Sequence, residues 1–476
     1  MNITIKSITM AIIFLFISCT FQYAYAIPFS HHDDLTGYYL SHQGDFSRRG
    51  FQDIYLSHPK FYKCIKSKLL YAYGFYPYPM PIVYRDYMIS LLSLFNTLLL
   101  AVYDIRFGTM VWSLTLKEFS LKNIFPPPSF ILDGRDIYIS VLFTLNGNDT
   151  HARLAVFICK CRLFGAIEWS KVILTPYIVH LGAFYSWYIH IGVLSSPSSF
   201  IFTYSGKLYV ILTRTLFFPI TAYILDESTG EVLTKKSLNL LEKEAARKFP
   251  YCASASISSG NLYLKTSVLS WLIDPSLIEM PCLMACFSLP SLELKWMKTF
   301  RSYECVNGVK LPYAPLVITN YVVEDQYGRV LFPNDLGIFV YDRDGNLLRN
   351  VTLKSIPEVG YVGSVSHLLA TNGRIYVLML KLRYLYIMDR DFNVLKIVDF
   401  KNLTNVHLPD FADISVQITR NMIFIALMGR VFNGVMLFDF EGNLIWAKYI
   451  PNMAGAFLAG NRIFIVASGR ILIYEC

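Results

Sequence analysis

The strongest constraint on this chain is a unit of about 50 residues that it repeats. Three copies in the C-terminal half are plain, because acidic turns at Asp342, Asp389 and Asp439 each separate two apolar runs. Self-similarity at such a period is typical of arrays built from one small supersecondary unit. Short apolar runs joined by tight turns are strand signals. The repeat therefore predicts a radial array of small antiparallel sheets, a β-propeller.

Fainter copies extend the repeat towards the N-terminus. Its turns align at positions 104, 161, 226, 288, 342, 389, 439 and 475, which predicts eight blades, with seven as the alternative. Four of the six tryptophans occupy one repeat position, seven or eight residues beyond the start of the turn: Trp112, Trp169, Trp296 and Trp446. A second landmark is a polar turn followed by an aliphatic and an aromatic residue, as in Gly206-Lys207-Leu208-Tyr209.

This series resembles the quinoprotein (PQQ-type) propeller repeat, with Asp104 to Trp112 and Asp226 to Gly230 matching it best. The resemblance covers residues 81–476 and implies an all-β ring of four-stranded antiparallel blades. It also implies that the Asp-Gly turns and the tryptophans are structural, with each tryptophan packed between adjacent blades. The residues that take this role are Asp104, Trp112, Trp169, Asp226, Gly230, Trp296, Asp342, Asp389, Asp439 and Trp446.

The last copy, Arg462 to Cys476, lacks an outer strand, and an unpaired strand edge invites association. The run from Phe61 to Leu70 alternates lysines with apolar residues and is expected to close the ring as that strand. The expected divisions are a signal peptide at 1–26, an N-terminal segment with the closing strand at 27–80, and the propeller at 81–476. Cys64 and Cys476 would share one sheet, where they form a disulfide or remain two unpaired thiols.

Residues 1–26 predict a secretory signal, with Lys6, an apolar run from Met10 to Ile17 and an Ala24-Tyr25-Ala26 cleavage site. An uncleaved N-terminal anchor and lipidation at Cys19 are the alternatives. We therefore expect a secreted or cell-surface protein, with N-glycosylation acceptors at Asn148, Asn350 and Asn402.

Several kinds of chemistry find no support in the residues. The net charge of +9 is spread without a basic tract of five, so we expect no nucleic-acid partner. Asp342 to Asn346 lacks the ligands of a calcium loop, and the cysteine pairs have strand spacing rather than zinc-site spacing. We predict no catalytic residue, metal or cofactor. The loop with Tyr185, Trp187 and His190 is the candidate ligand surface.

Two hypotheses about function follow. The first is an exported, non-catalytic propeller, expected to be monomeric, that acts as a binding or scaffold module for a protein or glycan of the cell envelope. Peripheral or N-terminal membrane association is compatible with it. The alternative implied by the resemblance is a PQQ-dependent quinoprotein dehydrogenase. Such enzymes often carry adjacent cysteines beside the quinone, and this chain has no Cys-Cys pair.

Overall fold

The computed structural model describes side chains and backbone in the repeat region and in a short stretch before it. The described residues are 55–66, 81–94, 97–116, 124–145, 151–180, 199–212, 220–238, 251–268, 280–302, 304–306, 309–311, 322–333, 337–353, 361–362, 367–371, 373–379, 384–399, 413–428, 433–451, 453–467 and 470–476.

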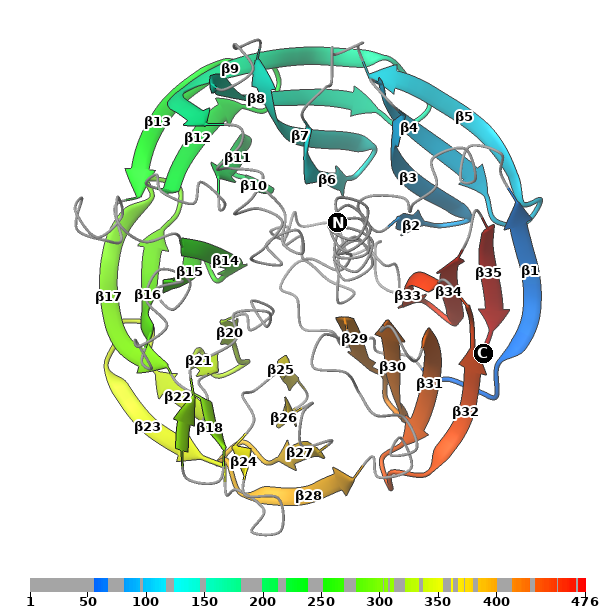
Figure 1. Cartoon of the computed structure of the whole chain (residues 1–476), viewed down its shortest axis with the longest axis vertical. Coiled ribbons are helices and arrows are strands. Elements are labelled where there is room, and N and C mark those ends of the chain that lie inside the picture. The colour runs from blue at the N-terminus through cyan, green and yellow to red at the C-terminus, as the bar shows by residue number, and fades with distance from the viewer. Residues whose placement is uncertain are drawn as a thin grey trace, which may run out of the picture.

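Eight four-stranded antiparallel sheets form a ring (Figure 1). The strands run outwards in chain order within blades 1 to 7. Blade 1 comprises β2 (Ile82–Tyr84), β3 (Tyr87–Leu94), β4 (Thr97–Asp104) and β5 (Thr109–Leu116). Blade 2 comprises β6 (Ile124–Asp133), β7 (Asp136–Leu145), β8 (His151–Arg162) and β9 (Ile167–His180). Blade 3 comprises β10 (Ser199–Tyr204), β11 (Lys207–Leu212), β12 (Ile220–Asp226) and β13 (Val232–Leu238).

The second half of the ring repeats this plan. Blade 4 comprises β14 (Tyr251–Ser258), β15 (Asn261–Val268), β16 (Met280–Ser288) and β17 (Glu293–Ser302). Blade 5 comprises β20 (Val323–Glu324), β21 (Val330–Pro333), β22 (Gly337–Tyr341) and β23 (Leu347–Thr352). Blade 6 comprises β25 (His367–Thr371), β26 (Arg374–Met379), β27 (Tyr384–Met388) and β28 (Val394–Asp399). Blade 7 comprises β29 (Asp413–Ile418), β30 (Met422–Met428), β31 (Asn433–Asp439) and β32 (Leu444–Tyr449).

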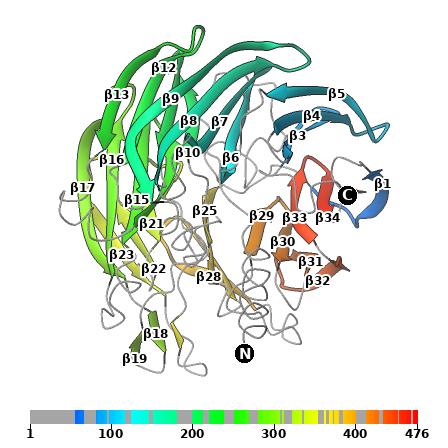
Figure 2. The ribbon, with the colours of Figure 1, turned by 45° about the horizontal axis from the view of Figure 1, so that its top comes forward.

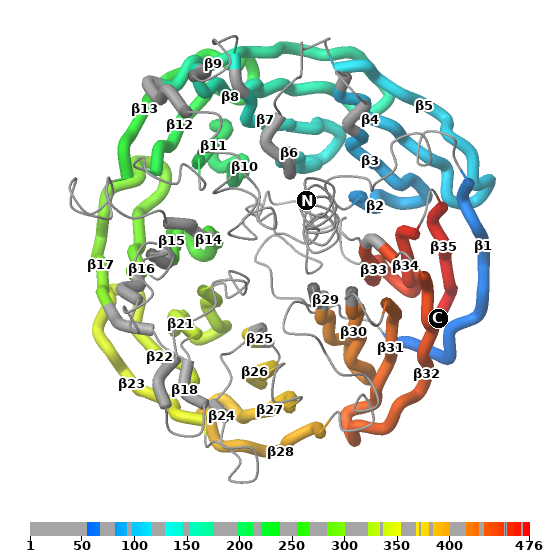
Figure 3. The backbone as a smooth tube through the Cα atoms, in the orientation of Figure 1, coloured from blue at the N-terminus to red at the C-terminus, as the bar shows by residue number. Residues whose placement is uncertain are grey.

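Blade 8 is made from both ends of the chain. It joins β33 (Met453–Ala459), β34 (Arg462–Ala467) and β35 (Arg470–Glu475) to β1 (Lys60–Lys66), which runs along the outer edge of β35 (Figure 3). The pairing is antiparallel, with Lys60 opposite Glu475 and Lys66 opposite Arg470. The prediction of eight blades closed by an N-terminal strand is confirmed, and the seven-bladed alternative is wrong.

One side-chain amide holds the chain on its way into β1. The Leu56 backbone amide donates to Asn421 Oδ1 at 2.9 Å, and Asn421 Nδ2 donates to the Leu56 carbonyl at 2.8 Å. The Leu56 side chain is buried. Because Asn421 belongs to blade 7, this bidentate contact guides the N-terminal stretch past blade 7 to the edge of blade 8.

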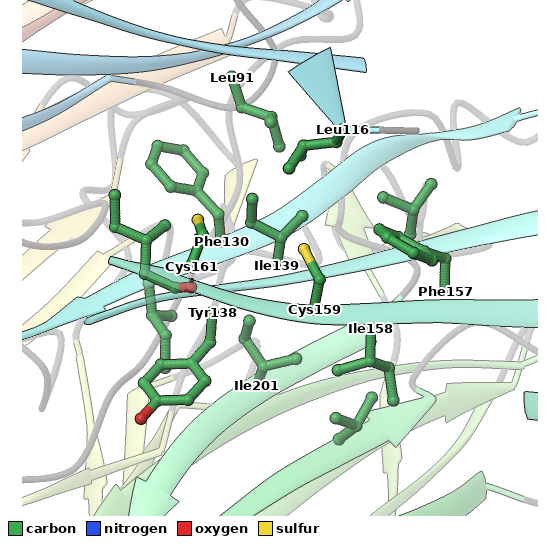
Figure 4. Packing of buried hydrophobic residues seen from close by; sticks show 14 of the residues in the cluster. Leu91, Leu116, Phe130, Tyr138, Ile139, Phe157, Ile158, Cys159, Cys161 and Ile201 are labelled. Carbon is green, nitrogen blue, oxygen red and sulfur yellow. Dashed lines mark hydrogen bonds between the residues drawn. The ribbon is translucent and has the colours of Figure 1, made fainter. Parts of the chain in front are cut away.

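The near-continuous apolar strands follow from burial on both faces by neighbouring blades. The largest core cluster runs through blades 1, 2 and 3 and includes Leu91, Phe130, Phe157 and Ile201 (Figure 4). Outside this ring plan, a small sheet of β18 (Glu304–Val306), β19 (Val309–Leu311) and β24 (Tyr361–Val362) joins segments that flank blade 5. β18 and β19 project from one side of the ring (Figure 2).

Each outer strand starts with the same irregularity. One or two residues pair with the neighbouring strand, the next is an unpaired bulge, and pairing resumes with the residue after it. In blade 1, Met110 pairs with Tyr103, Val111 is the bulge, and Trp112 pairs with Val102. A bulge adds local twist and redirects the side chain that follows it. We call the residue after the bulge the post-bulge residue.

Candidate functional site

The predicted ligand surface cannot be placed. Tyr185, Trp187 and His190 lie outside the described residues, as do the glycosylation acceptors Asn148 and Asn402. Asn350 is exposed on β23, the outermost strand of blade 5, where solvent can reach its side chain. The described candidates for a site are the residues of the repeat itself and the surface that the ring presents.

The turn aspartates are engaged in holding their own turns. Asp342 Oδ1 accepts the amides of Asp344 and Asn346 at 2.9 and 2.8 Å, and its Oδ2 accepts the Asn346 side-chain amide at 2.8 Å. Those donors favour the ionised form and lower the pKa of the Asp342 carboxyl, the Asn346 side chain contributing most. Asp389 and Asp439 repeat these three bonds within 0.1 Å.

The repeated tryptophans contact the turn of the following blade. Trp169 donates from Nε1 to the Glu227 carbonyl at 3.1 Å, and Trp296 donates to the Arg343 carbonyl at 2.8 Å. Their rings lie on the turn glycines, since a Cβ added at Gly230 would lie 2.5 Å from Trp169 Cδ2, and one at Gly345 2.6 Å from Trp296 Cγ. The turn must therefore carry glycine for the next blade to approach the indole ring this closely.

The two remaining repeat tryptophans make aromatic contacts instead. Trp112 meets Phe164 in the turn of blade 2, with ring centroids 6.2 Å apart, and Trp446 meets Tyr474 of blade 8 at 5.1 Å. All four tryptophans thus join one blade to the next. Their contacts are those of packing residues, with no group poised for chemistry beside them in the described chain.

Cationic side chains make the inter-blade contact in three blades whose post-bulge residue is not tryptophan, which the sequence analysis did not predict. The post-bulge residues of blades 5, 6 and 8 are Arg349, Lys396 and Lys63. Arg349 donates to the Asp391 carbonyl, Lys63 donates to the Arg106 carbonyl, and Lys396 pairs with the Glu441 carboxylate. Every acceptor lies in the turn of the following blade. These cations therefore make the same connection as the indole Nε1 of Trp169 and Trp296.

Blade 3 is the exception, and its post-bulge residue is Thr234. There Lys236, two residues further along the same face of β13, donates to the Ser291 carbonyl in the turn of blade 4 at 3.2 Å. A side chain from every outer strand thus reaches the neighbouring blade. The signal was present in the sequence, because Arg349 and Lys396 stand in the alignment column that also holds the four tryptophans.

The tyrosines of the second landmark make a parallel set of inter-blade bonds from the second strands. The Tyr138 hydroxyl donates to Glu227 Oε1 at 2.6 Å, and the Tyr209 hydroxyl donates to the Pro290 carbonyl at 3.0 Å. The Tyr263 hydroxyl donates to Glu324 Oε2 at 3.1 Å. These hydroxyls satisfy groups on the neighbouring blade, so the motif tyrosines also hold the ring together.

The described cysteines lie either in the core or at the closing edge of blade 8. Cys159 and Cys161 are buried among apolar side chains in blade 2 (Figure 4), and burial raises the pKa of Cys161 to about 12. Cys64 and Cys476 share the closing sheet but are free thiols. Cys64 lies opposite Leu472, whereas Cys476 lies beyond the Lys60–Glu475 pair. A four-residue offset is about 13 Å, beyond disulfide range, so the structure supports the alternative of two unpaired thiols.

Within the described residues, the outside of the ring exposes many side chains. We call the eight outermost strands the outer wall; these are β1, β5, β9, β13, β17, β23, β28 and β32 (Figure 1). The residue before the bulge is apolar in all eight, and seven of these side chains are more than a third exposed: Phe61, Met110, Val232, Leu294, Leu347, Val394 and Leu444. Blades related by rotation about the ring axis place these side chains at equivalent heights.

The outer wall is also strongly basic. Its described side chains include eleven lysines or arginines and three acidic residues, Glu168, Glu293 and Asp399. Basic side chains thus outnumber acidic ones on the wall and are interleaved with exposed apolar side chains, while the turn aspartates are engaged locally.

The described residues also bear on metal sites and on membrane-spanning helices. No three His, Cys, Asp or Glu side chains gather there in a way that could hold a metal ion. The described part of the chain contains no helix that is long and apolar enough to cross a membrane.

Comparison with known proteins places the chain by fold. No family model and no curated protein matches it. Among solved structures, the quinohemoprotein alcohol dehydrogenase ADHIIG from Pseudomonas putida HK5 is similar at a TM-score of 0.54 and 10% identity, over 93% of this chain and 81% of that one. The Dos1 propeller has a TM-score of 0.44 at 12% identity, over 82% of this chain and 89% of that chain. At 10% identity, the likeness to the alcohol dehydrogenase shows the propeller fold alone.

Proposed function

We propose that this chain is an exported, non-catalytic β-propeller that binds a protein or glycan of the cell envelope and acts as a scaffold. The observation that carries the proposal is the contrast between the repeat residues and the outer wall. Among the described residues, the turn aspartates, the buried cysteines and the repeat tryptophans are engaged in turns, in the core and in inter-blade contacts. The wall instead exposes apolar and basic side chains around the ring.

A mixture of apolar and cationic groups is what a binding surface needs. Exposed apolar side chains supply contact area, and charge complementarity supplies orientation and a faster encounter. The outer wall presents both kinds of group in repeated positions. A rigid ring that presents them is therefore suited to holding a partner in place.

The dehydrogenase alternative rests on the resemblance of the repeat. In native mass spectrometry of the chain offered calcium and pyrroloquinoline quinone, a stoichiometric quinone adduct would overturn the non-catalytic proposal. We expect the spectrum to show only the mass of the protein without bound quinone.

Binding itself is tested by co-sedimentation of the purified chain with envelope fragments of its source cell. We expect sedimentation that is reduced when the exposed apolar pair Leu347 and Leu348 is changed to serine, because these side chains lie on the wall. Protease treatment of the fragments would abolish binding to a protein partner, and periodate oxidation would abolish binding to a glycan. A chain that stays in the supernatant with untreated fragments would refute the proposal.

A further inference from the structure

One part of the outer wall differs from the rest in its residue types. We call it the seam wall, and it consists of the exposed side chains of β1 and β32, where blades 8 and 7 meet: Lys60, Phe61, Tyr62, Lys66, Leu444, Lys448 and Tyr449. Phe61 is 59% exposed and Tyr449 is 56% exposed. Neither strand contains an acidic residue. The seam wall therefore combines aromatic rings with lysines, of which Lys60 lies opposite Glu475 and Lys66 opposite Arg470 in the closing sheet.

A ring contact joins the two strands into one surface. The Tyr474 ring of β35 lies edge-on to Phe61 of β1 at 5.6 Å and edge-on to Trp446 of β32 at 5.1 Å, measured between centroids. Arg462 stacks over Tyr62 at 5.0 Å. These contacts fix the aromatic side chains at the seam from beneath, while leaving Phe61 largely exposed.

We propose that the seam wall docks the ring on the surface of an anionic lipid bilayer. Tyrosine and phenylalanine with lysine are the residue types that settle at a membrane–water interface, where rings enter the headgroup region and ammonium groups meet lipid phosphates. Each lysine near an anionic leaflet contributes on the order of fivefold in affinity. Three exposed lysines lie here, Lys60, Lys66 and Lys448. Lys60 has Glu475 opposite it, whereas Lys66 and Lys448 lie opposite Arg470 and Val435.

The mixture of side chains favours lipid over an acidic protein as the occupant. The rings of Phe61 and Tyr449 are exposed on the same wall as Lys66 and Lys448. Binding to a membrane surface grows with the apolar area that is buried and with electrostatic attraction to anionic lipids. The seam wall offers both kinds of contact. This inference goes beyond the proposed function and holds whether the partner is a protein or a glycan.

The test uses the full chain with vesicles of phosphatidylglycerol and phosphatidylcholine in equal parts, and with vesicles of phosphatidylcholine alone. The seam variant carries Lys60→Gln, Lys66→Gln and Lys448→Gln. A matched control on the far side of the ring carries Lys171→Gln, Lys235→Gln and Lys298→Gln. Equal unfolding midpoints for both variants and the parent chain show that neither change disturbs the fold.

We expect the seam variant to bind the anionic vesicles on the order of a hundredfold more weakly than the parent, and the control to bind almost unchanged. Hydrogen exchange with anionic vesicles should slow in residues 60–66 and 444–449 and not in residues 232–238. Equal weakening in both variants would mean that general charge is responsible, and would overturn the proposal. So would unchanged binding of the seam variant, failure of the parent to prefer anionic vesicles, or slowed exchange elsewhere only.

Discussion

The contact between Trp296 and Gly345 can be tested by adding one methyl group. In Gly345→Ala the new Cβ would lie 2.6 Å from Trp296 Cγ, and the backbone φ of +83° is unfavourable for alanine. The left-handed conformation costs about 1–2 kcal/mol, and overpacking a well-packed contact costs about 1–3 kcal/mol more. We therefore expect Gly345→Ala to lower the free energy of unfolding by about 2–5 kcal/mol.

Gly206 supplies the matched control for the backbone term. Its φ of +70° is similar, but an added Cβ would meet nothing within 4 Å. Gly206→Ala should then cost only the conformational part, about 1–2 kcal/mol. The difference between the two variants measures the inter-blade contact.

A double-mutant cycle isolates the contact further. Trp296→Ala should itself cost about 3–5 kcal/mol, because the indole is buried and donates to the Arg343 carbonyl. In that background the clash is gone, so Gly345→Ala should cost no more than Gly206→Ala. Guanidinium unfolding followed by far-UV circular dichroism gives each value. Equal losses for the two glycine variants, or an undiminished loss without the indole, would refute the packing argument.

Four further predictions follow from other contacts. Arg349→Ala should lower the free energy of unfolding by about 1 kcal/mol in the same unfolding assay. The Ser228 hydroxyl and the Thr229 amide lower the pKa of Asp226 to about 2, so its contribution to stability is present above about pH 4 and lost towards pH 2; melting temperatures of the parent and Asp226→Ala should converge there. Burial raises the pKa of the Cys286 thiol to about 12, so iodoacetamide at neutral pH should label it, by mass spectrometry, only after unfolding. Asn421→Ala should speed proteolysis near Leu56 by removing both bonds to its backbone.

The sequence was sufficient for the ring and its closure because both are written in a repeated local pattern. A strand–turn–strand unit that recurs eight times predicts a ring of blades. The missing outer strand of the last copy predicts that an N-terminal strand completes it. The roles of Asp342 and of the tryptophan column could be read in the same way. The candidate loop at Tyr185, Trp187 and His190 could not be assessed, since it lies outside the described residues.

The sequence pattern could not predict the strand register, as the two cysteines of the closing sheet show. Cys64 and Cys476 do share a sheet, yet a shift of four residues separates them. The alternation of β1 specifies which face is buried, and a slip by an even number of residues leaves that face unchanged. Only the packing of Phe61 and Ile65 against blades 8 and 1 selects one register.

The sequence by itself determined an all-β ring, its blade boundaries and the turns that carry the repeat, because these depend on local turn chemistry and on the spacing of apolar residues. The tertiary structure decided which side chains join one blade to the next and which remain outside. Indole, guanidinium and ammonium groups look unrelated in a sequence, yet Trp296, Arg349 and Lys63 each donate to a backbone carbonyl of the following turn. That equivalence arises only when the bulge and the neighbouring blade bring donor and acceptor together.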